Sequence, residues 1–172
     1  AVIVEGINSI QAGTEFNYIK GSNENETFFA GRGNSHLYGD GGKNLLVGYS
    51  GADKEGQTTF YVLGHENDAA NTIQAFDFVS DDNYTNNNRI TADKLEVDLN
   101  TNFVNRVELS NNDVLVNVTN RDYTATESVI IKGVVDSLTG YGQDILISGD
   151  GVVDDVVAQV GNDKLNFDKF AN

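Results

Sequence analysis

Large apolar residues recur every nine positions through the first third of the chain, and polar residues follow the same period. The polar position stands two residues before the apolar one, and Gly or Ala opens most units. The apolar series is Ile10, Ile19, Phe28, Leu37 and Leu46. The polar series is Asn8, Asn17, Glu26, Ser35, Asn44 and, next in phase, Asp53. An α-helix does not have this period, and glycine twice in each unit would destabilise one.

This period predicts a short strand, a tight turn that glycine permits, and a second strand. Two units, about eighteen residues, make one coil of a parallel β-roll in which the apolar side chains stack inward. We therefore predict an all-β fold whose first part, residues 1–58, contains six units and roughly three coils.

The units resemble the Gly-Gly-x-Gly-x-Asp-x-(large apolar)-x nonapeptides of RTX proteins. The clearest copies are Ala-Gly-Arg-Gly-Asn-Ser-His-Leu-Tyr at 30–38 and Gly-Tyr-Ser-Gly-Ala-Asp at 48–53. Later segments, beyond an insertion at 54–58, resemble blocks that follow the repeats in hemolysin-type, serralysin-like C-terminal regions. They are Thr-Phe-Tyr-Val at 59–62, Asn-Thr-Ile-Gln-Ala-Phe-Asp-Phe at 71–78 and Asp-Lys-Leu-Glu-Val-Asp-Leu at 93–99.

The resemblance implies calcium binding, because in RTX repeats the Asp at position six and backbone carbonyl oxygens bind calcium. Here that position keeps a carboxylate only in Glu26 and Asp53. Alternate units turn at the same edge of a roll, so no two carboxylates fall in successive turns. One edge is expected to stack Asn8, Glu26 and Asn44, and the other Asn17, Ser35 and Asp53. We expect most turns to be calcium-free, with Asn and Ser side chains bonding to the turn amides.

A few residual calcium sites are the alternative for these turns, near Glu26, Asp40 and Asp53. Two later segments, 142–147 and 161–166, look like the Gly-x-Asp-x-Leu core of a repeat, and either could bind cations or cap turns. The candidate metal-binding residues are Glu26, Asp40, Asp53, Asp77, Asp144 and Asp163.

The second half of the chain alternates apolar and polar residues in strand-length runs. These runs predict mixed or antiparallel strands at 59–63, 71–79, 94–99, 106–109, 114–118 and 128–131, with a hairpin turn at 110–113. Residues 59–172 are expected to continue the same domain and to cap it. A cap is needed because the last coil would otherwise expose its backbone edge.

Composition narrows the choice of partners. The 172 residues carry a net charge of −15, from 11 basic and 26 acidic residues, and include no cysteine. Such a charge repels nucleic acid and anionic membranes, and no apolar run approaches the roughly 20 residues needed to span a bilayer. The negative charge suits a solvated extracellular protein or one that collects divalent cations, and solubility alone is the alternative explanation.

Candidate catalytic groups do not form a recognisable site in the sequence, so we expect no enzyme. His36 falls at an outward strand position, and His65 lies in a polar turn. The acidic pairs at 81–82 and 154–155 are sequence neighbours, which point to opposite faces of a strand. Tyr38, Tyr49 and Tyr61 are candidates for a sugar-stacking surface, with ordinary packing as the alternative.

These features predict a non-catalytic RTX-like module of a larger secreted or cell-surface bacterial protein, exported by type I secretion. Its role would be export, folding or spacing, its main partner would be the rest of that polypeptide, and its cofactor would be calcium at few sites. Residues 165–172 resemble an acidic and apolar export tail. The chain starts at Ala1 without a signal-peptide pattern, as expected for an excised module. The alternative is a polysaccharide- or cell-surface-binding module attached to an extracellular enzyme or adhesin.

Overall fold

The computed structural model describes residues 2–3, 9–62, 69–77, 93–97, 101–110, 113–133, 144–148 and 153–157. Residues 2–3, 105–110, 144–148 and 153–157 are described through their backbone alone. Within these ranges the protein is all-β and contains no helix, as predicted. In the same part of the chain, no helix has the length and apolarity that crossing a membrane requires.

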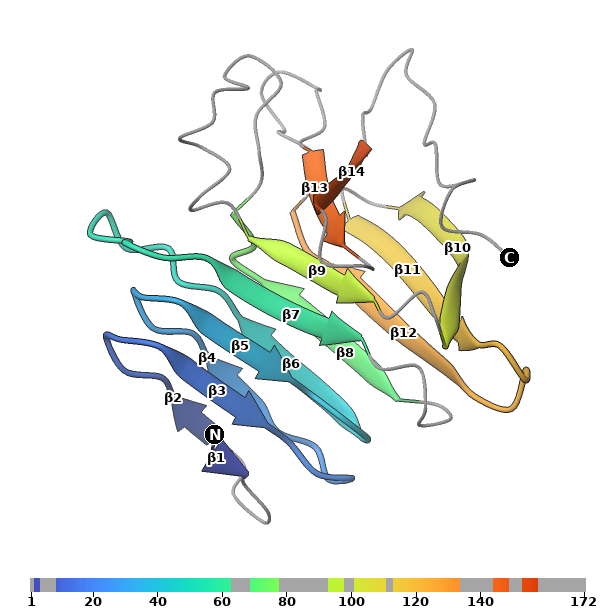
Figure 1. The fold of residues 1–172 in the computed structure, drawn as a ribbon, viewed down its shortest axis with the longest axis horizontal. Coiled ribbons are helices and arrows are strands. Elements are labelled where there is room, and N and C mark those ends of the chain that lie inside the picture. The colour runs from blue at the N-terminus through green and yellow to red at the C-terminus, as the bar shows by residue number, and fades with distance from the viewer. Residues whose placement is uncertain are drawn as a thin grey trace.

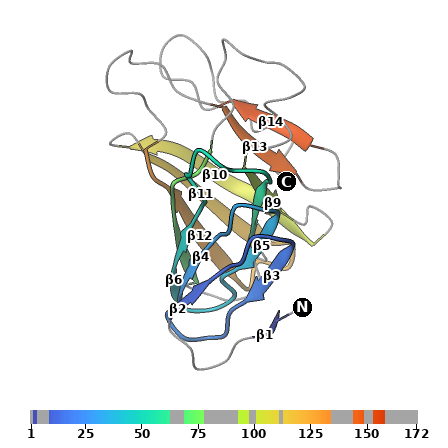
Figure 2. The same ribbon diagram turned by 90° about the vertical axis from the view of Figure 1, so that its left-hand side faces the viewer.

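The strands alternate between two sheets that face each other (Figures 1 and 2). Sheet A has the order β1 (Val2–Ile3), β3 (Asn17–Lys20), β5 (Ser35–Tyr38), β7 (Thr58–Val62), β9 (Lys94–Val97), β13 (Asp144–Ser148) and β14 (Val153–Val157). Sheet B has the order β10 (Asn102–Ser110), β11 (Asp113–Asn120), β12 (Thr126–Ile131), β8 (Ala70–Gln74), β6 (Lys43–Val47), β4 (Thr27–Phe29) and β2 (Ser9–Gln11).

Pairing is parallel from β1 to β13 in sheet A and from β2 to β12 in sheet B. Consecutive strands cross from one sheet to the other and return two strands later, which is the winding of a parallel roll. The parallel winding continues through β7, β8 and β9, beyond residue 58, where the sequence predicted the repeats to end. Antiparallel pairing joins β10, β11 and β12 in sheet B and joins β13 to β14 in sheet A.

The predicted apolar stack forms the core between the sheets. In sheet A, Ile19, Leu37, Phe60 and Leu95 are register partners on successive strands. In sheet B the corresponding series is Ile10, Phe28, Leu46, Ile73 and Ile131. All of these side chains except the half-buried Ile10 are buried, so each rung of one sheet packs against the other and removes apolar surface from water.

The later strands occur at the predicted positions, but several of them begin or end at other residues than predicted. The hairpin of β10 and β11 is confirmed, with Ser110 opposite Asp113. Strand β8 ends at Gln74 rather than 79, because Ala75 adopts a left-handed backbone conformation, with φ of 51°, that cannot continue a strand. Residues 63, 78–79 and 98–99 of the predicted runs lie outside the described residues.

Phe28 and its neighbour Phe29 allow a matched test of this packing. Phe28 is fully buried between the sheets, whereas Phe29 points outward from the same strand and is half-buried. We expect Phe28→Ala to lower the free energy of unfolding by about 3–5 kcal/mol, because it leaves a cavity in the core. Phe29→Ala should cost clearly less. Urea denaturation of both variants measures the difference, and equal losses would contradict the inward stacking of Phe28.

Candidate functional site

A ladder of polar side chains lines each edge of the roll, where the chain turns from one sheet to the other. We call the edge that leads into sheet B the amide edge and the edge that leads into sheet A the lysine edge. The amide edge contains Glu26, Asn44, Asn71 and Glu127, and the lysine edge contains Asn17, Ser35, Thr58 and Asp93. All but Asn17 are buried. Buried polar groups must find hydrogen-bond partners, so these ladders decide how successive turns are held together.

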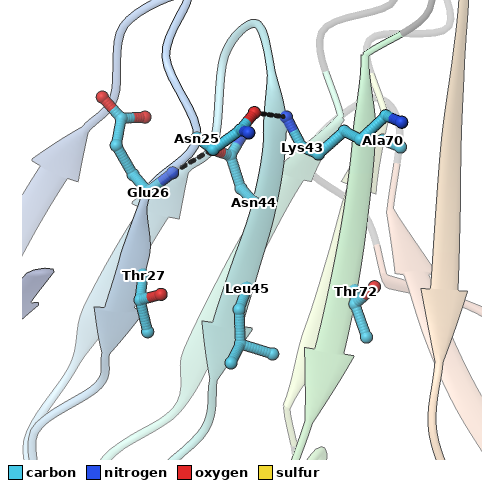
Figure 3. A pocket seen from close by; sticks show the side chains of 8 residues that line it. All are labelled: Asn25, Glu26, Thr27, Lys43, Asn44, Leu45, Ala70 and Thr72. Atoms are coloured by element: carbon cyan, nitrogen blue, oxygen red, sulfur yellow. Dashed lines mark hydrogen bonds between the residues drawn. The ribbon is translucent and has the colours of Figure 1, made fainter. Parts of the chain in front are cut away.

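Asn44 is the central group of the amide edge. Its Oδ1 accepts from the backbone N–H of Glu26 at 2.9 Å (Figure 3). Its Nδ2 donates to the carbonyl oxygens of Gly39 at 3.0 Å and Gly41 at 2.8 Å, and contacts Oδ1 of Asn71 at 3.1 Å. The side-chain amide therefore lies where the carbonyl oxygens of a turn converge, and it joins three successive coils.

The ladder of the amide edge ends on a buried acid. Nδ2 of Asn71 donates to Oε1 of Glu127 at 2.6 Å, and Glu127 is 2% exposed. The tight spacing of this edge explains the glycine at position 39, since a Cβ there would collide with the side chains of both Asn44 and Asn71. Glycine is thus required at this turn by close approach.

Two predicted metal residues, Glu26 and Asp40, lie in neighbouring turns of the amide edge. Both carboxylate oxygens of Glu26 accept from the backbone N–H of Ser22, at 2.9 and 3.1 Å, and Oε1 also accepts from the Ser22 hydroxyl at 2.6 Å. Asp40 has a left-handed φ of 59° in its turn and forms an ion pair with Lys20 at 3.4 Å. Protein groups thus already neutralise or hydrogen-bond both carboxylates.

A shallow hollow lies on the outer surface of sheet B next to these turns. Its volume is about 360 Å³, and Thr27, Leu45 and Thr72 line it from three adjacent strands (Figure 3). Asn25 and Lys43 close one end, where Oδ1 of Asn25 accepts from the Lys43 backbone N–H at 2.8 Å. None of the side chains that line it is a His or Cys, and its one acid, Glu26, is the ladder residue bonded to Ser22.

The lysine edge begins with neutral groups. Oδ1 of Asn17 accepts from the N–H of Gly13 at 3.0 Å, and its Nδ2 donates to the carbonyls of Gly13 and Glu15 at 3.0 and 2.7 Å. On the next coil, Oγ of Ser35 accepts from the N–H of Gly31 at 3.1 Å. These contacts match the predicted bonding of Asn and Ser side chains to the turn amides.

Further along the lysine edge, a charged group replaces the neutral ones. Asp93 is fully buried, and its Oδ1 accepts from Nζ of Lys54 at 2.8 Å and from the N–H of Thr58 at 2.9 Å. Its Oδ2 accepts from the N–H of Asp77 at 2.9 Å, and Lys54 also pairs with Oδ2 of Asp77 at 2.9 Å. Burial raises the pKa of Asp93 to about 6, while the Lys54 ammonium acts in the opposite direction.

The prediction that Asp53 stands in the ladder is wrong. The register partner of Ser35 on the next coil is Thr58, not Asp53, because the chain inserts five residues before β7. The Asp53 side chain is 60% exposed; it accepts from the Tyr49 hydroxyl at 2.6 Å and lies 3.8 Å from Arg32. The hydrogen bond from Tyr49 lowers the pKa of Asp53. Of the remaining metal candidates, Asp144 is described in backbone alone and Asp163 lies outside the described residues.

The tyrosine candidates separate into two places. Tyr38 and Tyr61 stack on the outer surface of sheet A with ring centroids 3.9 Å apart, and Tyr18 extends the row at 4.8 Å from Tyr38. Tyr49 lies in the loop after β6 and bonds to Asp53 instead. His36 joins the row, with Nδ1 2.7 Å from the hydroxyl of Tyr61, and burial lowers its pKa. His65 lies outside the described residues.

The comparison with protein families bears directly on these turns. The sequence model of the RTX calcium-binding nonapeptide repeat, in four copies, matches residues 4–37 and 20–55. Residues 4–55 are an RTX repeat module. No curated protein and no solved structure matches the chain. The matches end at residue 55, so the resemblance of the later segments to RTX C-terminal regions stays a prediction.

RTX repeats are calcium-binding motifs of a structural, generally non-catalytic kind. The residues in the turns show whether this chain could bind calcium there. Calcium needs six to eight oxygen ligands, carboxylates among them. At Asn44 a donor nitrogen already bonds to two turn carbonyl oxygens, and at Asp93 an ammonium bonds to the carboxylate. These two positions, Asn44 within the matched repeats and Asp93 beyond them, do not fit calcium. Among the described residues, no three Asp, Glu, His or Cys side chains gather to hold a metal ion.

Five groups of the two edges were missed by sequence reasoning. Thr58, Asn71 and Asp93 each stand two residues before a core residue, the same offset as in the repeats, so that offset could have identified them beyond residue 53. Glu127 also stands two residues before a core residue, Val129, so the same offset could have identified it. Lys54 carries no such signal, because it lies in the insertion.

Replacing Asn44 tests whether its amide holds the turns. Asn44→Ala leaves two carbonyl oxygens and the Glu26 N–H without their partner. We therefore expect the free energy of unfolding to fall by on the order of 2–4 kcal/mol. Asn44→Asp has no donor and adds a charge, so it should be at least as unstable in chelator but should recover when calcium is added.

Denaturation by urea, with chelator and with calcium, measures both effects. Asn25→Ala is the matched control, since this exposed Asn makes a single side-chain bond to the neighbouring turn. A loss at Asn44 no larger than that at Asn25 would contradict the central role of its amide.

Proposed function

We propose that the chain is a structural RTX β-roll module of a larger exported bacterial protein. In most of its turns, side chains bond to the turn oxygens that calcium binds in other repeats. Its role is to fold and space the polypeptide outside the cell, with weak residual calcium binding. The observation that supports this proposal best is the amide edge, where Asn44 donates to the carbonyl oxygens of Gly39 and Gly41. A turn whose carbonyl oxygens accept hydrogen bonds from a side-chain amide can fold without a bound ion.

The proposal includes the arrangement of about three coils in the repeat region and a cap formed by later strands. The antiparallel strands β10–β12 support the capping part, because they cover the end of sheet B that the parallel strands leave at β8. Covering such an edge prevents pairing with other chains. Export by type I secretion rests on the RTX family alone.

Residual calcium binding is proposed at the turns of Glu26 and Asp40. Oε2 of Glu26 and the carbonyl oxygen of Gly39 both approach Gly21 so closely that a Cβ there would collide with them. Two oxygens from successive turns thus lie on the same side of the ladder, with Asp40 in the same turn as Gly39. This is a partial ligand set, short of the six oxygens that tight calcium binding needs.

Thermal melting of the whole chain in chelator and in millimolar calcium tests the proposal. We expect a cooperative transition in chelator and a rise of no more than about 2–3 °C in calcium, because a weakly bound ligand stabilises the native state little. Glu26→Gln combined with Asp40→Asn should remove that small rise. A rise of many degrees, or an unfolded chain in chelator, would contradict the calcium-independent fold.

A second candidate function, binding of a neutral polysaccharide or cell-surface glycan, is favoured by the aromatic row of Tyr18, Tyr38 and Tyr61. The row runs across three adjacent strands on the outer surface of sheet A. Tyr38 and Tyr61 face each other closely, so they would offer ring edges and hydroxyl groups to a sugar rather than open ring faces. The net charge of −15 argues against an anionic glycan.

Affinity electrophoresis through soluble neutral polysaccharides tests this second candidate. We expect retardation of the native chain and its loss in the double variant Tyr38→Ala and Tyr61→Ala. Tyr123→Ala is the control, because Tyr123 is 67% exposed but lies at the turn between β11 and β12. Equal mobility of all forms in every polysaccharide would eliminate glycan binding by this row.

A further inference from the structure

The loop from Gly48 to Gln57 breaks the eighteen-residue rhythm of the roll. Ile19 and Leu37 are register partners 18 positions apart, as are Phe28 and Leu46, whereas Leu37 and Phe60 are 23 positions apart. The five extra residues nevertheless pack in an ordered way. The N–H groups of Glu55 and Gly56 both donate to the carbonyl of Arg32, at 2.8 and 2.9 Å. An anchored insertion of this kind positions its side chains firmly.

Lys54 is the side chain that this insertion directs into the edge. Its side chain is 10% exposed, in a chain where Lys43, for comparison, is exposed to solvent. Its Nζ lies 2.8 Å from Oδ1 of Asp93 and 2.9 Å from Oδ2 of Asp77. The ammonium therefore joins three segments: its own loop, the end of β8 and the start of β9.

Asp93 needs a cation at this place. It is fully buried, stands two residues before the core residue Leu95, and is the lysine-edge rung that follows Thr58. An ionised carboxylate at such a depth is strongly unfavourable unless it is paired and hydrogen-bonded. The neighbouring ladder residue, Thr58, is a second buried polar group. Its Oγ1 has no hydrogen-bond partner among the described residues. This part of the edge therefore combines a buried carboxylate with a buried hydroxyl that no described group bonds.

We propose that the Lys54 ammonium is a tethered cation that takes the place of a bound divalent ion on the lysine edge. The five-residue insertion delivers it, and it links its own turn, between β6 and β7, to Asp77 and Asp93 of the connection between β8 and β9, as an ion between the two turns would. The inference deepens the proposed calcium-independent fold and rests on it. Both edges then provide a partner for buried oxygen atoms, but by different groups. The amide edge uses the uncharged amide of Asn44, and the lysine edge uses the charged ammonium of Lys54.

Charge balance indicates what the site accepts when Lys54 is removed. One ammonium faces two carboxylates, so its loss leaves two negative charges, which one divalent cation would neutralise. A hollow of about 380 Å³, lined by Tyr49, Ala75 and Asp77 together with Lys54, reaches this point from the surface. Oxygen ligands, a charge of two and solvent access favour calcium, which accepts irregular coordination more readily than magnesium does.

The experiment uses the whole chain and follows thermal melting in chelator, in millimolar calcium and in millimolar magnesium. We expect Lys54→Ala to lower Tm by about 10 °C in chelator, because it breaks a buried pair, and calcium to recover at least half of that loss. Magnesium should recover less. Lys54→Ala combined with Asp93→Asn should respond to calcium no more than the native chain does, and the control Lys43→Ala should behave as the native chain.

Calorimetric titration provides the second readout and covers a variant that folds poorly. Lys54→Ala should bind one more calcium ion than the native chain, and the added Asp93→Asn change should remove that ion. A Lys54→Ala variant that melts like the native chain in chelator would overturn the inference, as would one that neither binds nor responds to calcium. A large calcium response of the native chain would overturn the proposed function instead, which keeps the two failures distinct.

Discussion

Stacking of turns is the constraint on which the rest of this structure depends. Each coil of a parallel roll brings its turn directly over the turn before it, and the backbone carbonyl oxygens of the turns converge on the same small volume. Buried oxygens there need a donor or a positive charge. On the amide edge Asn44 donates to turn carbonyl oxygens, and on the lysine edge the Lys54 ammonium pairs with the carboxylates of Asp93 and Asp77. The core rungs can align only once this requirement is met, since the ladder residue and the core residue are two positions apart on the same strand.

The repeating part of this arrangement could be predicted from the sequence, because every unit places a polar residue two positions before an inward-facing apolar one. The inward stacking of Phe28, Leu37 and Leu46 follows from a period that only a rolled chain explains. Asp53 shows where such reasoning fails. Counting in nines places it in the ladder, but an insertion shifts the register, and the position of an insertion is set by packing against the previous turn rather than by the period. The partner of Glu127 was equally out of reach, since its contact with Asn71 joins residues 56 positions apart.

The strong acidity of the chain is consistent with this division of roles. In a roll that relied on calcium, acidic residues would gather at the inner edges. Here the described acidic side chains at the inner edges are few and are bonded to protein donors, as Glu26 is to Ser22 and Asp93 is to Lys54. Other described acids, such as Asp53 and Glu55, lie outside, where Arg32 faces them. Among the described residues, the acidic side chains therefore lie more on the surface than in the framework of the roll.

The buried acid at the end of the amide ladder also bears on how such a module could lengthen by gene duplication. A new pair of units inserted between Asn44 and Asn71 would meet amides on both sides and could continue the same bonding pattern. Beyond Asn71 the next rung is Glu127, which accepts hydrogen bonds but cannot donate one while ionised. Growth of the amide edge past that point would need a new donor. The amide ladder therefore ends at this carboxylate, and a longer amide edge would need a different residue in its place.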